Sequence, residues 1–232
     1  MQKITLLILC LFLISQIDAQ TIRRIDDTEL NTLELGQRLQ ELQQAANVHG
    51  LTVSIVTQDK IVFQKAYGFR NIDQNQTLQI TDQFYAASLS KALFAYLVMK
   101  LVEEGQIDLD KPLIEYLDQP LTSYSFKQDT EGYQDLKEDK RYEKITARMC
   151  LSHTSGLPNW RYINNGRIDM EHPLEFEYDP GTTYSYSGEG IQILQFVVEQ
   201  ITGTSLEGLA KKYVFEPFDM KETCFLWQDS FE

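Results

Sequence analysis

Residues 84–105 read FYAASLSKALFAYLVMKLVEEG, and this stretch decides the fold. Its apolar residues recur every three or four positions, which is typical of a helix with one broad buried face. The residues on that face are Leu93, Phe94, Leu97, Val98, Leu101 and Val102. Gly105 follows in the position of a helix stop, so the sequence predicts a buried helix that begins at Ser88 and ends before Gly105.

The start of this helix carries the pattern S-x-x-K, as Ser88-Leu89-Ser90-Lys91. Side chains three residues apart share one helical face, so the Lys91 amine can hydrogen-bond the Ser88 hydroxyl. A neutral lysine amine can accept a serine proton, and backbone N–H groups at a helix start can bind an oxyanion. The alternative is that this short pattern is accidental and that Ser88 only caps the helix.

The flanking sequence predicts further elements. Residues 29–47 form an amphipathic helix with Leu30, Leu33, Leu39 and Leu42 near one face. Alternating apolar residues over 51–67, interrupted by the polar turn 58–60, predict a β-hairpin whose second strand ends at Gly68. Residues 127–144 are rich in charge and predict a solvated excursion, and residues 189–202 predict a helix that Gly203 ends.

The composition limits the class of protein. The chain has 232 residues with a net charge of −13, which disfavours a nucleic-acid partner because phosphate backbones repel it. It contains three histidines and no HExxH or CxxC pattern, so we expect no metal and no other cofactor. A single domain is the simplest expectation for this length.

The N-terminus has the pattern of an export signal. Lys3 precedes an apolar run over residues 4–14, and Ala19 stands before Gln20 as a small residue at a cleavage site. We expect a signal peptide at 1–19, a secreted or periplasmic protein and no stable membrane span after cleavage; an uncleaved anchor is the alternative. The mature chain would keep Cys150 and Cys224, either as a disulfide or as free thiols.

Two downstream stretches follow in a characteristic order, LSHTSGLP at 151–158 and PGTTYSYSGEGIQILQFVVEQITG at 180–203. Together with Ser88 and Lys91 they resemble the serine β-lactamase and penicillin-recognising hydrolase family, most closely its class C branch of β-lactamases, DD-peptidases and related esterases. The resemblance implies an α/β (α+β) fold over residues 20–232. An antiparallel sheet is flanked by helices, with a mostly helical subdomain at about 81–204.

The resemblance also implies residue roles. Ser88 matches the acylated nucleophile, Lys91 matches the lysine that activates it, and Tyr186 matches a tyrosine that exchanges protons with the serine and the leaving group. Gly188 stands where the family usually has a substrate-binding asparagine. The family's third motif, on a strand near the C-terminus, is missing, so we expect an incomplete sheet and a chain that is truncated at its C-terminal side.

His153 and Ser155 within LSHTSGLP allow a second interpretation, a serine–histidine pair. They are only two residues apart and no G-x-S-x-G pattern is present, so a structural turn is the preferred interpretation. The overall expectation is an exported serine hydrolase that forms an acyl-enzyme from a β-lactam, a D-Ala-type peptide or a small ester. The alternative is a truncated or inactive relative that only binds a cell-wall peptide or a protein partner.

Overall fold

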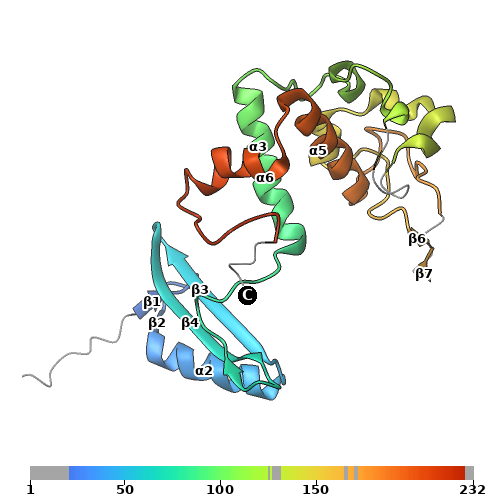
Figure 1. Ribbon diagram of the computed structural model, residues 1–232. Helices are drawn as coiled ribbons and strands as arrows, with labels where there is room; N and C mark the ends of the chain where they lie inside the picture. The colour runs from blue at the N-terminus through green and yellow to red at the C-terminus, as the bar shows by residue number, and fades with distance from the viewer. Residues whose placement is uncertain (1–20, 125, 127–131, 165–166, 170–171, 228–232) are drawn as a thin grey trace, which may run out of the picture. The chain divides into compact units, whose positions relative to one another are not determined.

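A long antiparallel hairpin forms the centre of the first of two units (Figure 1). The computed structural model describes residues 21–124, 126, 132–164, 167–169 and 172–227, so the expected signal peptide lies outside the described residues. The first unit runs to Phe84 and the second begins at Tyr85. Each unit is described by itself below.

The predicted hairpin is confirmed as β3 (Gly50–Thr57) and β4 (Lys60–Asn71). Gln58 and Asp59 form the turn, with φ of 50° and 60°. Positive φ at both central residues is the backbone that right-twisted two-residue hairpins prefer. Asn and Asp adopt it most readily among residues with a side chain, and Asp59 fits that pattern.

The predicted end of the second strand at Gly68 is wrong, because β4 continues through that residue. Gly68 has φ of 77°, and a Cβ there would lie 2.1 Å from the backbone oxygen of His49. The missing side chain lets the strands pass closely, and the Phe69 N–H donates to the same oxygen at 2.8 Å. The strand then pairs with β5 (Gln76–Thr77), which gives a three-stranded sheet in the order β3-β4-β5.

Helix α2 (Thr32–Ala45) begins later than the predicted helix. The preceding residues form β2 (Glu29–Asn31), which pairs with β1 (Thr21–Arg23), and Asn31 then caps the helix through its side-chain oxygen. Leu30 therefore lies in a strand. The expected apolar face is also wrong at Leu33 and Leu42, which are 62% and 48% exposed.

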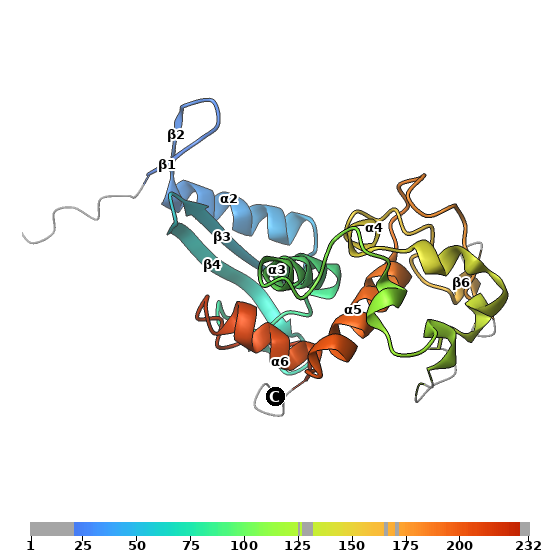
Figure 2. The same cartoon turned by 90° about the horizontal axis from the view of Figure 1, so that it is seen from above.

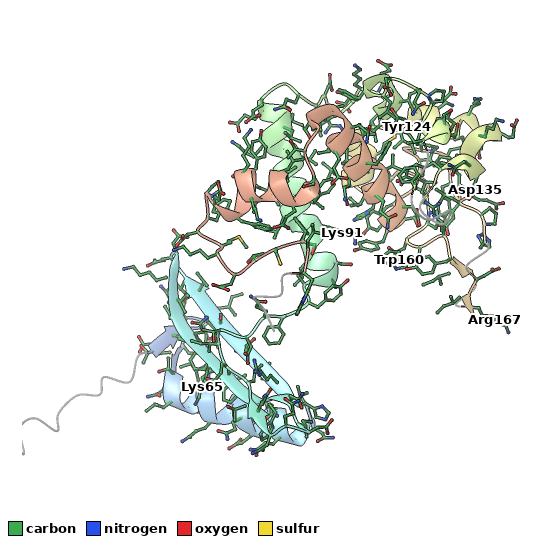
Figure 3. The ribbon with its side chains drawn as sticks, in the orientation of Figure 1. Lys65, Lys91, Tyr124, Asp135, Trp160 and Arg167 are labelled. Carbon is green, nitrogen blue, oxygen red and sulfur yellow. The ribbon has the colours of Figure 1, made fainter. Side chains whose placement is uncertain are left out.

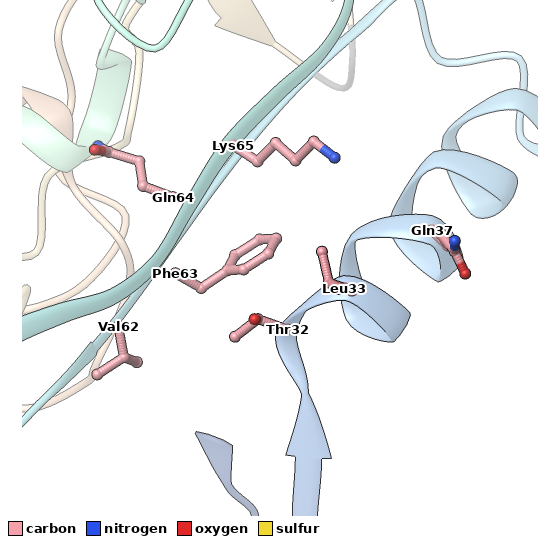
Figure 4. A pocket seen from close by; sticks show the side chains of 7 residues that line it. All are labelled: Thr32, Leu33, Gln37, Val62, Phe63, Gln64 and Lys65. Carbon is pink, nitrogen blue, oxygen red and sulfur yellow. The ribbon is translucent and has the colours of Figure 1, made fainter. Parts of the chain in front are cut away.

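Helix α2 lies along the hairpin (Figure 2), and its one buried residue is Gly36. A shallow hollow lies beside this contact, lined by residues of α2 and β4 (Figure 4). Among its described lining residues the charged one is Lys65, and the others are Thr32, two glutamines and apolar side chains.

The second unit is built on two apolar helices, α3 (Ser90–Glu103) and α5 (Gly188–Thr202). The buried residues of α3 are Phe94, Leu97, Val98 and Leu101, and those of α5 include Ile193, Leu194, Val197 and Val198. Both predicted helices are confirmed. Gly105 and Gly203 follow them with φ of 72° and 61°, which is the left-handed backbone of a helix end.

Shorter elements complete this core. Helix α4 (Ala147–Leu151) packs on α5, while α6 (Leu206–Ala210) packs on α3 and leads into a π-helical turn, Lys211–Phe215 (Figure 2). Between α3 and α4 the described residues include 3-10 helices at Leu113–Tyr116, Leu121–Ser123, Gln134–Glu138 and Lys140–Lys144. A small ribbon pairs β6 (Ile163–Asn164) with β7 (Arg167–Ile168).

The predicted solvated excursion at 127–144 is wrong over its described part, residues 132–144. Tyr133, Leu136 and Tyr142 are only 2%, 1% and 3% exposed and belong to the core. Mostly exposed polar and charged residues lie between them in the sequence. The high charge content of the segment therefore does not reveal that three of its side chains are buried. Residues 127–131 lie outside the described residues.

The sheets of the described chain are small, with at most three strands each, as expected for an incomplete sheet. Cys150 is buried and Cys224 is half-buried, and both are free thiols. Burial raises the pKa of the Cys150 thiol. Among the residues that the structure describes, no helix has both the length and the apolar character that crossing a membrane requires.

Candidate active site

Ser88 lies in a 3-10 turn, Ala87–Leu89, directly before α3. The α-helix therefore begins at Ser90 rather than at Ser88. Ala87 has φ of 45°, a left-handed backbone that is strained for a residue with a Cβ. Neither the turn nor α3 has a side-chain cap, so the capping alternative for Ser88 finds no support. Instead the Ser88 side chain is exposed at the helix entry.

Lys91 is half-buried in the first turn of α3 (Figure 3). Its Nζ donates a hydrogen bond to Ser88 Oγ at 3.1 Å. The contact follows from the i, i+3 spacing, as the sequence predicts. The pair is therefore positioned for a proton exchange between the hydroxyl and the amine.

Tyr186 completes the cluster from a loop that precedes α5. Its hydrogen bond with Ser88, together with its contact with Lys91, holds the pKa of the phenol below its ordinary value. The Lys91 Nζ also lies 5.3 Å from the centre of the Tyr186 ring. The structure thus brings together Ser88, Lys91 and Tyr186, the three residues to which the family resemblance assigns catalysis.

Buried hydrogen bonds of Ser155 and Ser187 hold the Tyr186 loop to the rest of the unit. Ser187 caps α5 by accepting the Gly190 N–H at 2.9 Å, and its hydroxyl lies 3.1 Å from the Pro158 oxygen. Ser155 is fully buried and its hydroxyl reaches Ser187 Oγ at 3.2 Å. These hydrogen bonds therefore connect the LSHTSGLP turn to the first turn of α5 and hold Ser187, the residue beside Tyr186, in place.

The position of Ser155 favours the structural interpretation of the LSHTSGLP turn. A hydroxyl with no exposed surface is closed to a substrate. His153 contacts Tyr186 instead, with 4.4 Å between the two ring centres. The serine–histidine alternative therefore has no geometric support.

Gly188 is buried, and no side chain fits at this position. A Cβ would lie 2.4 Å from the backbone oxygen of Asn159 and 3.0 Å from its Oδ1. The first of these atoms belongs to the main chain and cannot rotate away. The loop at Asn159 therefore takes the space where a side chain on Gly188 would begin, so Gly188 can offer a substrate only its backbone.

We expect Gly188→Ala to displace the Asn159 loop and to lower the free energy of unfolding by about 1–3 kcal/mol, as overpacking does in a well-packed interior. Urea unfolding measures this change. Gln192→Ala is the matched control because Gln192 lies on the exposed side of the same helix. Equal stability of the two variants would contradict the close approach of Asn159.

Sequence reasoning missed a buried ion pair at the start of α5. Glu189 and Arg161 have side chains only 2% and 5% exposed, and their closest atoms are 2.7 Å apart. The Arg161 backbone N–H also donates to Glu189 Oε1 at 3.1 Å, and its guanidinium reaches the Gly132 oxygen. The available signal was Glu189 itself, a charged residue between two glycines at the start of the predicted helix.

The acidic residues Asp108 and Asp110, which do not belong to the cluster at Ser88, contact each other, and Asp110 binds Arg148. Asp110 accepts two hydrogen bonds from Arg148 at 2.6 and 2.7 Å, and its N–H donates to Asp108 Oδ1 at 2.9 Å. In the described ranges, no group of three or more His, Cys, Asp or Glu side chains is gathered as a metal site requires. After Gly203 the described residues form no strand, so the strand that carries the family's third motif, which is missing from the sequence, has no counterpart there.

Comparisons with known proteins support the fold of this unit and of the hairpin. Protein flp of Staphylococcus aureus strain MW2 is 24% identical over 192 residues, which cover 78% of this chain and 36% of that protein. The octameric penicillin-binding protein homologue from Pyrococcus abyssi superimposes with a TM-score of 0.62 at 22% identity. EstCE1, a hydrolase with promiscuous acyltransferase activity, gives the same TM-score and identity.

The matches span only part of the length of each of these known proteins. The structural matches cover 82% and 79% of this chain but only 44% and 51% of the two solved proteins. At these identities they show the shared β-lactamase-like fold. The model of the Beta-lactamase family matches residues 35–232, which is most of the chain and includes Ser88, Lys91 and Tyr186. The chain therefore belongs to the Beta-lactamase family.

Proposed function

We propose that this protein is a serine hydrolase that transfers the acyl group of its substrate to Ser88. The observation that carries the proposal is the hydrogen bond of 3.1 Å between Lys91 Nζ and Ser88 Oγ, with Tyr186 against the same two side chains. A nucleophile needs a neighbouring base that is itself held in place. Tyr186 is the proposed proton acceptor at this serine, and Lys91 contacts both groups.

The first step is acylation. The Tyr186 phenolate accepts the Ser88 proton while Oγ forms a bond to the substrate carbonyl carbon. The carbonyl oxygen becomes an oxyanion, and we assign its stabilisation to the Ser88 backbone N–H at the helix entry. Tyr186 then returns its proton to the leaving group as the tetrahedral centre collapses to the Ser88 ester.

The second step is hydrolysis of that ester. Tyr186, again a phenolate, accepts a proton from water, and the resulting hydroxide attacks the acyl carbon. Collapse releases a carboxylic acid, and the proton passes from Tyr186 to Ser88 Oγ. The Lys91 ammonium stabilises the phenolate in both steps, which agrees with the lowered pKa of Tyr186.

The proposed substrate class follows from this chemistry. The acyl donor is a β-lactam, a D-Ala-type peptide or a small ester, since each presents a carbonyl with a leaving group. Gly188 adds no side-chain amide to the site, which favours small acyl groups that need few polar contacts. We also propose export, because residues 1–19 have the pattern of a cleaved signal peptide.

The direct test of substrate class uses the 232-residue chain with three donors: a chromogenic cephalosporin, a peptide ending in D-Ala-D-Ala and a p-nitrophenyl ester. We expect turnover of at least one donor and its loss in Lys91→Met. Tight binding of the peptide without turnover of any donor would support the binding-only alternative and contradict the hydrolase.

Tyr186→Phe is expected to slow acylation by about 10²- to 10⁴-fold, the usual contribution of a general base. The active form is the phenolate, so the wild-type rate is lost as pH falls through the lowered pKa of Tyr186. Because that pKa lies below the ordinary value of 10, the rise in rate should come at a lower pH than for a free phenol. Stopped-flow rates from pH 5 to 10 measure both effects.

Tyr184→Phe is the matched control, since Tyr184 lies two residues away and is 70% exposed. It should keep the wild-type rate and the wild-type pH profile. A Tyr186→Phe variant that retains the same rise with pH would show that another group accepts the serine proton.

A further inference from the structure

We propose that His153 is the positioning residue for Tyr186, which it holds against Ser88 and Lys91 through its neutral imidazole and its backbone oxygen. The inference rests on the proposed function, because it concerns the proton carrier of that reaction. It assigns a role to a residue that neither accepts the serine proton nor contacts Ser88 in the proposed steps.

His153 binds both chain neighbours of Tyr186. Its backbone oxygen accepts the Ser185 N–H at 2.9 Å, and its ring Nδ1 accepts the Ser187 N–H at 3.2 Å. Its imidazole also packs on the phenol ring, with 4.4 Å between centres and 41° between planes. One residue therefore fixes the backbone on either side of Tyr186 and the ring between them.

The backbone conformation at position 153 limits which residue types can make these contacts. It has φ of 56°, and its N–H donates to the Cys150 oxygen at 3.2 Å where α4 ends. Histidine and asparagine are among the few residues with a side chain that often adopt this left-handed conformation. Both also offer a hydrogen-bond acceptor at a similar distance from the backbone, so asparagine is the conservative replacement.

The Ser187 contact requires a neutral ring. Nδ1 accepts a hydrogen bond, so the proton of the neutral imidazole lies on Nε2. Burial lowers the pKa of His153, and the charge of Lys91 acts in the same direction. The other titratable groups whose rings face it are Tyr186 and Tyr184, the second at 6.1 Å.

Protonation would remove the acceptor. A proton on Nδ1 would point at the Ser187 N–H and break that contact, while the second positive charge would face Lys91. Because the folded pKa lies below 6.5, the folded protein keeps the neutral ring as pH falls to 6.5 and loses it at lower pH. Tyr186 should therefore leave its position at acidic pH.

The test uses the full chain labelled with ¹³C at the tyrosine ζ carbon, with the Tyr186 signal identified by its loss in Tyr186→Phe. We expect His153→Ala to move this signal and to raise the Tyr186 pKa toward 10, because the phenol leaves Ser88 and Lys91. His153→Asn should restore the wild-type signal. His49→Ala, which removes an exposed imidazole in the first unit, is the control and should change neither.

Two further readouts separate positioning from packing. His153→Phe keeps a ring beside Tyr186 but offers no acceptor, so it should resemble His153→Ala. Misplacing a reacting group by about 1 Å can lower a rate about 10²-fold, so we expect a loss of that order in kcat for His153→Ala, with KM little changed. Below pH 6.5 the Tyr186 signal should shift in wild type and stay in place in His153→Asn.

An unchanged Tyr186 signal in His153→Ala, or full rescue by phenylalanine, would overturn the proposal. The signal is read without turnover, so the two proposals can fail separately. If Ser88 is never acylated in wild type but His153→Ala still moves Tyr186, the hydrolase proposal fails and the positioning role stands. If Ser88 is acylated at equal rates in wild type and His153→Ala, the positioning role fails.

Discussion

Replacing Ser88 with alanine is expected to lower the rate of hydrolysis by about 10³- to 10⁶-fold, the range seen when a catalytic serine is removed. The remaining Lys91 and Tyr186 would still bind and polarise a substrate, but no atom would be left to accept the acyl group. The rate of product release from the fastest donor measures the effect. The free energy of unfolding should change little, because Ser88 is exposed.

Ser90→Ala is the matched control for this variant. Ser90 lies two residues away in the first turn of α3, so its replacement tests the same helix entry without the hydroxyl that Lys91 contacts. It should retain wild-type turnover. A Ser88→Ala variant with wild-type turnover would show that the reaction uses another nucleophile.

Replacing Glu189 with alanine is expected to destabilise the second unit by about 3–5 kcal/mol, because it leaves the Arg161 guanidinium buried without its partner. The pair lies in the interior, with side chains 2% and 5% exposed. Three hydrogen bonds join Glu189 at the start of α5 to Arg161, and the Arg161 guanidinium also donates to the Gly132 oxygen. Chemical unfolding followed by circular dichroism measures the loss.

Asp110→Asn provides the control for that prediction. Asp110 also binds an arginine through two short hydrogen bonds, to Arg148, but both side chains are more than half exposed. Solvent screens such a pair, so its loss should be much smaller. Equal losses for the two variants would show that the burial of Glu189 and Arg161 does not determine the stability of α5.

The parts of the site that could be predicted from the sequence are those set by local geometry. Ser88 and Lys91 are three residues apart on one helix, and that spacing alone brings their side chains together. Tyr186 is far away in the chain, and only the resemblance to a known family placed it at the same serine. Its contact depends on how α3 and α5 pack, which no short pattern records.

The features that the sequence failed to predict also depend on contacts between distant parts of the chain. The contact between Arg161 and Glu189 spans 28 residues and joins two segments with no shared motif. Periodicity indicates that α2 has an apolar side but not how much of it is covered, so the sequence predicts packing for Leu33 and Leu42, which are exposed. At Gly68 the glycine predicts a strand end, whereas its missing side chain lets the neighbouring backbone approach.

The central claim is that Ser88 carries the acyl group, and intact-mass analysis of the protein after brief exposure to an activated ester or a penicillin tests it most directly. We predict a mass gain equal to one acyl group less the hydrogen that it replaces, or to one whole penicillin because ring opening loses no atoms. Peptide mapping should place it on Ser88, and the gain should be absent in Ser88→Ala. A folded wild-type protein that gains no mass, or gains it on another residue, would contradict the account.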